Sequence, residues 1–139
     1  YVNTMYWQVM IQEATATSDM PPSLLAVIVY VESGGDPYAV SSAGAVGLAQ
    51  IMPRETGFSE RPTAAELRDP KLNLRWAVLI YEWFYEVCGG WLPGVLATYA
   101  GAADRQCNPT DLGWWYIKEV GLAQAKFIYL DRWWLWHPA

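Results

Sequence analysis

A run of eight apolar or aromatic residues, positions 24–31, ends directly at a carboxylate, Glu32, and constrains the fold more than any other feature. Such a run is either a buried strand or a buried helix, and periodicity alone does not decide between them. Pro22, just before the run, suits the first turn of a helix. Because the neighbouring segments also have helical patterns, we predict a buried helix that begins near Pro22 and ends at Glu32.

The rest of the chain predicts further helices and no convincing alternating strand. Thr63 and Glu66 have capping-box spacing, and Asp69-Pro70 combines an acidic cap with a proline suited to the first turn. A pair of glycines at 89–90 ends the helix that begins at Pro70. The predicted helices cover residues 2–16, 22–32, 47–52, a short segment after 63, 70–88, 92–100 and 110–133. The fold class predicted is therefore mainly α.

Length and charge limit the classes of protein that this chain can belong to. With 139 residues, of which 53% are hydrophobic, the chain can form the core of one domain, so we interpret 1–139 as a single domain. A formal net charge of −5 with scattered basic residues argues against a nucleic-acid partner. No stretch reaches the roughly 18 uncharged apolar residues of a transmembrane segment. The chain begins at Tyr1 without a basic, then apolar leader, so a targeting signal is not visible in it.

Histidine and cysteine are too rare for most metal or nucleophile chemistry. Two cysteines, Cys88 and Cys107, and one histidine, His137, do not make a zinc site or a histidine-activated nucleophile. We therefore predict no metal and no cofactor. The cysteines form either a disulfide or two buried thiols, and a disulfide would imply an oxidising compartment.

Glu32 is the candidate catalytic group. At the C-terminal end of a buried helix, both the helix dipole and the loss of solvation disfavour the negative charge, and both raise the pKa of the carboxyl. A carboxylic acid that stays protonated near neutral pH can donate a proton to a leaving oxygen. The structural alternative is a helix-end glutamate that accepts hydrogen bonds from loop amides.

The segments that follow carry a family resemblance. Residues 32–41 are Glu-Ser-Gly-Gly-Asp-Pro-Tyr-Ala-Val-Ser, and residues 43–53 are Ala-Gly-Ala-Val-Gly-Leu-Ala-Gln-Ile-Met-Pro. Downstream are Asp-Pro-Lys-Leu-Asn-Leu at 69–74, Val-Leu-Ala-Thr-Tyr at 95–99 and Tyr-Ile-Lys-Glu-Val at 116–120. In this order, over about 22–120, they resemble the motifs of the SLT lytic transglycosylases, goose-lysozyme-like enzymes that cleave bacterial peptidoglycan.

The resemblance implies a lysozyme-like α fold with a saccharide-binding groove and Glu32 as the catalytic acid and base. Such enzymes cleave the MurNAc–GlcNAc β-1,4 bond of peptidoglycan glycan strands without adding water, and they form a 1,6-anhydro ring. They need no cofactor and act outside the cytoplasm, in the periplasm, secreted or on a virion. The substrate-binding residues that carry over to this chain are Ser33, Gln50, Met52, Tyr99 and Tyr116.

Two other functions are compatible with the same motifs. A goose-type lysozyme would need a second carboxylate to position water; Asp36 is nearest in sequence, but Asp36-Pro37 is more typical of a turn. A glycan-binding or structural module without turnover is the other alternative, because Ala100 stands where the family has Asn. The Trp-rich segment 133–136 either packs onto the domain, offers a sugar platform or docks to a larger assembly.

Overall fold

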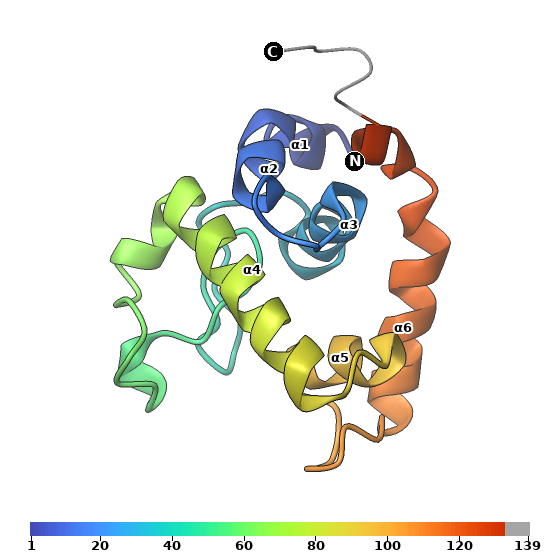
Figure 1. The fold of residues 1–139 in the computed structure, drawn as a ribbon. Helices are drawn as coiled ribbons and strands as arrows, with labels where there is room; N and C mark the ends of the chain where they lie inside the picture. Colours follow the sequence, from blue (N-terminus) through green and yellow to red (C-terminus); the bar gives the residue numbers. More distant parts are fainter. Residues whose placement is uncertain (133–139) are drawn as a thin grey trace.

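The computed structural model describes residues 1–132, which form a mainly helical structure (Figure 1). The α-helices are α1 (Val2–Met5), α2 (Gln8–Thr15), α3 (Pro22–Ser33), α4 (Pro70–Val87), α5 (Leu92–Tyr99) and α6 (Asp111–Gln124). Three short 3-10 helices are η1 (Arg54–Thr56), η2 (Glu66–Arg68) and η3 (Ile128–Arg132). Within residues 1–132, β pairing is limited to isolated bridges. The mainly α fold class predicted from the sequence is confirmed.

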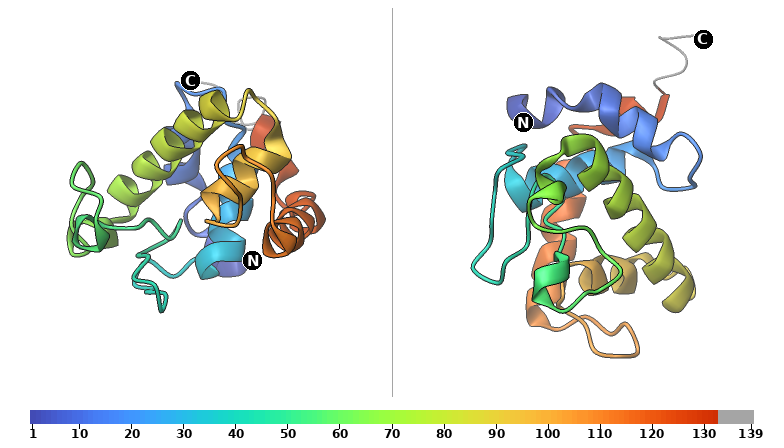
Figure 2. Two further views of the ribbon diagram at one scale, coloured as in Figure 1. Left: turned by 90° about the horizontal axis from the view of Figure 1, so that it is seen from below. Right: turned by 90° about the vertical axis from the view of Figure 1, so that its left-hand side faces the viewer.

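Helix α3 is the centre of the core, and α1, α2, α4, α6 and η3 all pack against it (Figures 1 and 2). Pro22 occupies its first turn, and Gly34 ends it in the left-handed conformation, with φ of 63°. Every residue from 23 to 29 is buried, so the helix is enclosed around its whole circumference. This is why its sequence shows no apolar stripe, and it places Glu32 in the last turn of the most enclosed element.

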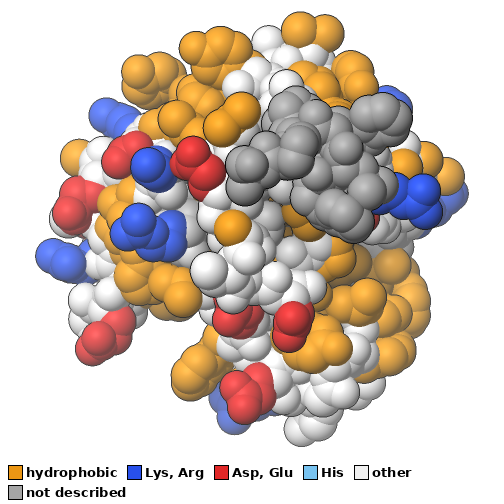
Figure 3. All heavy atoms as spheres, turned by 45° about the horizontal axis from the view of Figure 1, so that its top comes forward, with side chains coloured by type: hydrophobic (Ala, Val, Ile, Leu, Met, Phe, Trp, Pro, Cys, Tyr) orange, Lys and Arg blue, Asp and Glu red, His pale blue; other side chains and the backbone are white. Residues whose placement is uncertain are grey.

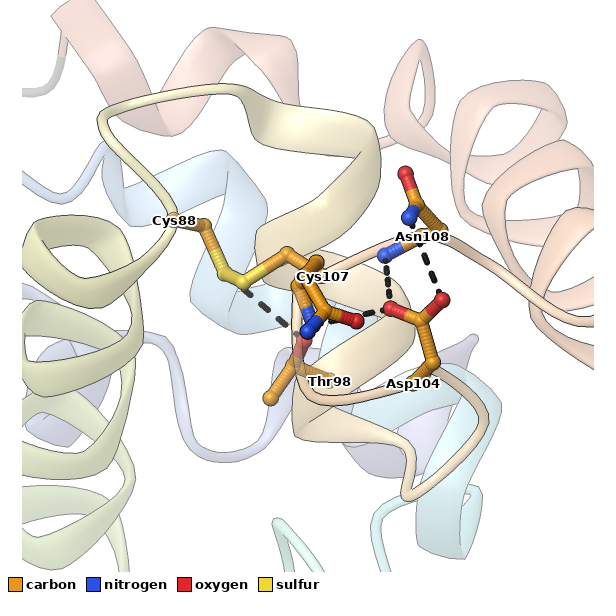
Figure 4. The surroundings of a disulfide bond; sticks show 6 residues. Cys88, Thr98, Asp104, Cys107 and Asn108 are labelled. Carbon is orange, nitrogen blue, oxygen red and sulfur yellow. Dashed lines mark hydrogen bonds between the residues drawn. A yellow bond between two sulfur atoms is a disulfide. The ribbon is translucent and has the colours of Figure 1, made fainter.

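Helix α4 begins and ends as the sequence predicts. The Asp69 side chain accepts a hydrogen bond from the backbone N–H of Lys71, and Pro70 occupies the first turn. At its other end, Cys88 forms a disulfide with Cys107, close to Thr98 on α5 (Figure 4). The bridge closes a loop that contains α5, and constraining a loop of this length in the unfolded chain is worth roughly 3 kcal/mol.

The predicted short helix over 47–52 is wrong. Residues 47–50 form a tight turn instead, and Val46 and Ile51 exchange two backbone hydrogen bonds, N–H to O, of 2.9 and 3.0 Å. Both Gly47 and Gln50 have positive φ, 84° and 54°, which a right-handed helix does not allow. We call residues 46–51 the anchored turn, because contacts from three helices hold it.

Two predicted helices are interrupted near a large side chain that packs against distant parts of the chain; Trp7 is partly buried and Phe127 is fully buried. The predicted helix 2–16 breaks at Trp7, whose indole N–H donates to the carbonyl oxygen of Gly35 at 2.9 Å. The predicted helix 110–133 stops at Gln124 and resumes as η3, because the chain turns to place the fully buried Phe127 in the core. The Trp-rich segment 133–136 and His137 lie outside the described residues.

Charged side chains of both signs alternate on the face that Figure 3 shows, and Lys and Arg form no continuous basic surface there. This distribution agrees with the net charge of −5. Among residues 1–132, no helix combines the length and the apolar character needed to cross a membrane.

Candidate active site

The candidate site surrounds Glu32, in the last turn of α3, where side chains from α5 and α6 approach it. Burial raises the pKa of Glu32 from 4.5 to about 7, and Tyr116 partly opposes this shift by favouring the charged form. A carboxyl with this pKa is partly protonated at neutral pH, so it can donate a proton and afterwards accept one.

Two tyrosines, Tyr99 from α5 and Tyr116 from α6, lie near the carboxyl. Burial first, and then the charge of Glu32, hold the pKa of both phenols well above the usual range, so both stay protonated. The Tyr99 hydroxyl donates to the carbonyl oxygen of Ala49 at 3.0 Å. The Tyr116 hydroxyl is buried and close enough to Glu32 to lower the pKa of that carboxyl, although no hydrogen bond of ordinary length and angle reaches it from any described residue.

Asn73, on α4, holds the anchored turn from inside the core. Its side chain is fully buried, and its Oδ1 accepts from the backbone N–H of Ala49 at 2.9 Å. Its Nδ2 donates to the carbonyl oxygens of Val46 and Leu67, at 2.8 and 2.9 Å. Only glycine fits at position 47, since a Cβ there would contact the Asn73 amide and lie 2.8 Å from the Leu67 oxygen.

Ser33 ties the anchored turn to the helix that carries the acid. Its hydroxyl donates to the carbonyl oxygen of Leu48 at 2.7 Å and accepts from the N–H of Gly35 at 3.1 Å. It also lies 3.1 Å from the carbonyl oxygen of Val29, one turn earlier in α3. Through these contacts, Ser33 holds the anchored turn at Leu48 and the loop after α3 at Gly35 in fixed positions.

Gln50 in the anchored turn and Met52 just after it line a cavity of about 160 Å³, and Tyr99 lines the same cavity. The Gln50 amide donates to the carbonyl oxygens of Ala39 and Gly47, both at 3.1 Å, and so stabilises its own left-handed backbone. The structure therefore gathers Gln50, Met52 and Tyr99 at one cavity. Glu32 and Tyr116 lie near Tyr99, and Ser33 contacts the turn from α3.

The structure also shows contributors that sequence reasoning did not single out. Asn73 lies in the motif at 69–74, but nothing in the sequence indicated that its amide would bind the anchored turn. Arg61 and Phe58 line the same cavity from the loop after η1, and no local pattern marked them.

A second carboxylate does not accompany Glu32 in the part of the chain that the structure describes. Burial and Tyr116 are the influences that set the pKa of Glu32. Asp36 is exposed, and its carboxylate accepts from the backbone N–H of Tyr38 at 2.9 Å, which is the turn predicted from Asp36-Pro37. Among residues 1–132, no group of three or more His, Cys, Asp or Glu side chains could hold a metal ion.

Comparisons with known proteins identify a family and a solved structure that this chain resembles. The profile of the family described as "Transglycosylase SLT domain" matches residues 9–111. Among solved structures, a complex of the 70-kDa soluble lytic transglycosylase with bulgecin A matches with a TM-score of 0.72 and 22% sequence identity, over 90% of this chain. The chain spans about a quarter of the length of that enzyme, 24%. This structural match shows that the fold is the lysozyme-like one predicted from the sequence.

Replacing Asn73 with alanine should destabilise the protein by about 2–5 kcal/mol, because the N–H of Ala49 and the carbonyl oxygen of Leu67 lose their partners, while the Val46 oxygen keeps only its bond from Ile51. Urea unfolding followed by circular dichroism measures the change. Asn108→Ala is the matched control: this asparagine is exposed, bonds only Asp104 through its side chain, and should cost about 0.5 kcal/mol or less. Equal losses in the two variants would contradict the role of Asn73.

Glu32 should make the native fold less stable as pH rises. The folded state holds the proton more tightly, with a pKa of about 7 against 4.5, so full stability is present below about pH 4.5 and is lost as pH rises through 7. The loss is about 3 kcal/mol. Glu32→Gln cannot titrate, so its free energy of unfolding relative to the native protein should rise by that amount between about pH 4 and pH 8.

Urea unfolding at several pH values tests this expectation, with Glu82→Gln, an exposed glutamate on α4, as the control. The control should follow the native pH dependence. Parallel curves for native protein and Glu32→Gln would show that the Glu32 carboxyl is not tuned by burial.

Proposed function

Because this chain belongs to the family of transglycosylase SLT domains, we propose that it is a peptidoglycan lytic transglycosylase in which Glu32 is the single acid and base. The observation that carries the proposal is the partly buried Glu32 carboxyl, with its raised pKa and with no second carboxylate beside it among the described residues. Hydrolases of glycosidic bonds ordinarily use a pair of carboxylates, whereas one group suffices when the substrate supplies its own nucleophile.

In the first step, the Glu32 carboxyl donates its proton to the glycosidic oxygen between MurNAc and GlcNAc. The bond from this oxygen to C1 of MurNAc breaks, and GlcNAc leaves with a hydroxyl at C4. Positive charge develops at C1, and the N-acetyl oxygen of the same sugar stabilises it. A protonated carboxyl near neutral pH is what this step needs, and burial of Glu32 supplies it.

In the second step, the Glu32 carboxylate takes the proton from the C6 hydroxyl of the same MurNAc. The C6 oxygen bonds to C1 and closes the 1,6-anhydro ring, and Glu32 returns to its protonated form. No water is consumed, so the two products together have the composition of the substrate. A pKa of about 7 suits both steps, because the group must donate and accept at one pH.

The neighbouring side chains have positioning roles in this proposal. Tyr116 is a protonated, buried hydroxyl beside Glu32 that can donate to the carboxylate formed in the first step. Gln50, Met52 and Tyr99 line the cavity in which the sugar next to the acid would lie. The amide nitrogen of Gln50 is bound to the protein, which leaves its oxygen to accept from the substrate.

Substrate and chemistry place this activity outside the cytoplasm, where peptidoglycan lies. The Cys88–Cys107 disulfide supports this location, since such bonds persist in oxidising compartments.

Mass spectrometry of the muropeptides released from purified peptidoglycan tests the proposal. The native protein should release anhydro products, each lighter by one water than the product of hydrolysis, and Glu32→Gln should release at least about a hundredfold less. Glu82→Gln, on an exposed part of α4, should act as the native protein does. Products with reducing ends would instead identify a goose-type lysozyme. No release by the native protein from several wall types would identify a module without turnover.

A further inference from the structure

A second, larger hollow adjoins the cavity at Gln50 and Tyr99. Its volume is about 550 Å³, and it lies between α4 and the loop that follows η1. The two cavities share four lining residues, so the hollow extends the cavity at Gln50 and Tyr99 along α4. The shared residues are Phe58, Arg61, Ile80 and Phe84.

Aromatic surface lines this hollow and is left open to solvent. The Trp83 side chain is 69% exposed and Phe58 is 40% exposed, and Trp76 adds a third ring. An indole offers a flat apolar face and one hydrogen-bonding edge, and a sugar ring offers an apolar C–H face and a rim of hydroxyls. Apolar walls with a few polar groups that fix orientation are also the ordinary composition of a ligand site.

Arg61 is the cation at the junction of the two cavities. Its guanidinium lies over the Phe58 ring, 4.0 Å from the ring centre, and its Nη1 donates to the carbonyl oxygen of Met52 at 3.1 Å. Glu60 also lines the hollow, but no carboxylate of the described residues is within salt-bridge distance of Arg61. Burial lowers the pKa of Arg61, while Tyr99 opposes this shift, so a bound anion would relieve an unfavourable environment.

The geometry of Arg61 suits a carboxylate in particular. The contacts with Phe58 and Met52 hold the guanidinium plane in one orientation and leave N–H donors on its other edge. A planar guanidinium binds a carboxylate through two parallel hydrogen bonds. A neutral sugar would gain nothing from this charge, but a sugar that carries an acid would.

We propose that the hollow is a distal subsite that binds a carboxylate-bearing N-acetyl sugar of the glycan strand, with Trp83 against the sugar ring and Arg61 on the carboxylate. This inference rests on the proposed function for its substrate class and adds the identity of the sugar and the residues that select it. The carboxylate is either the lactyl group of a muramyl sugar without peptide or an acid of an attached peptide stem.

Calorimetric binding tests the subsite without turnover, because every variant is made in the Glu32→Gln background. The ligands are three hexasaccharides: an N-acetylglucosamine oligomer without carboxylates, a peptide-free alternating glycan with lactyl carboxylates, and the same glycan with peptide stems. Arg61→Gln should weaken binding of at least one carboxylate-bearing ligand about tenfold and leave the neutral oligomer within about twofold. Arg61→Lys keeps the charge but loses the planar, two-pronged donor geometry, so its affinity for the carboxylate-bearing ligand should lie between those of the background and of Arg61→Gln.

Trp83→Ala should weaken binding of all three ligands about fivefold or more, since every sugar ring can stack on the indole. The matched controls are Arg75→Gln, an exposed arginine on α4, and Trp114→Ala, a half-exposed tryptophan on α6; neither residue lines the hollow, and both variants should bind as the background does. Thermal melts establish that each variant is folded. If Arg61→Gln weakens binding of the peptide-free alternating glycan, the lactyl group is the carboxylate that Arg61 binds. If it weakens only binding of the glycan with peptide stems, the stem supplies the carboxylate.

The outcomes separate the subsite from the proposed activity. Binding of all ligands unchanged by Arg61→Gln and Trp83→Ala overturns the subsite, even if native protein releases anhydro products. An equal loss for neutral and carboxylate-bearing ligands in Arg61→Gln overturns the carboxylate assignment, and no saccharide binding by the background overturns the whole inference. The expected binding losses with no anhydro product from the native protein would leave the subsite standing and reject the transglycosylase activity.

Discussion

The hydrogen bonds of the Asn73 amide are the constraint on which the site depends. One fully buried side chain on α4 binds both edges of the anchored turn, at Val46 and Ala49, together with the carbonyl of Leu67. The turn so fixed presents the Leu48 oxygen to Ser33 and the Ala49 oxygen to Tyr99. Loop backbone in contact with a core must find such partners, and here the partners come from three different helices.

Burial around α3 explains the raised pKa of the carboxyl in its last turn. The helix is enclosed on every side, and the carboxyl at its end is desolvated by the same packing that stabilises the core. The raised pKa of Glu32 means that the charged form costs the protein stability at neutral pH. Proteins commonly carry a destabilised group at a functional site, and packing elsewhere in the structure offsets its cost in stability.

The parts of the fold that could be predicted from the sequence are those with local causes. Pro22, Asp69-Pro70 and Gly89-Gly90 set the limits of helices through their own backbone and capping chemistry, and the enclosed run 24–31 could only be central. The anchored turn could not be predicted, because Asn73, more than twenty residues away, supplies the side-chain partners of Val46 and Ala49. The breaks at Trp7 and near Phe127 depend on distant packing in the same way.

For the candidate site, the motifs indicated Glu32, Gln50, Met52, Tyr99 and Tyr116, which the structure brings close to one another. The roles of these residues toward a substrate remain predictions. The hollow lined by Arg61, Phe58 and Trp83 had no sequence signal, since residues from a loop and from α4 meet there only after folding.

NMR titration of glutamate side chains labelled with 13C at the carboxyl carbon measures directly whether the fold keeps the partly buried Glu32 carboxyl partly protonated at neutral pH. The resonance missing in Glu32→Gln identifies the group. We expect a titration midpoint of about 7 for this resonance. A midpoint near 4.5, the ordinary value for glutamate, would contradict it.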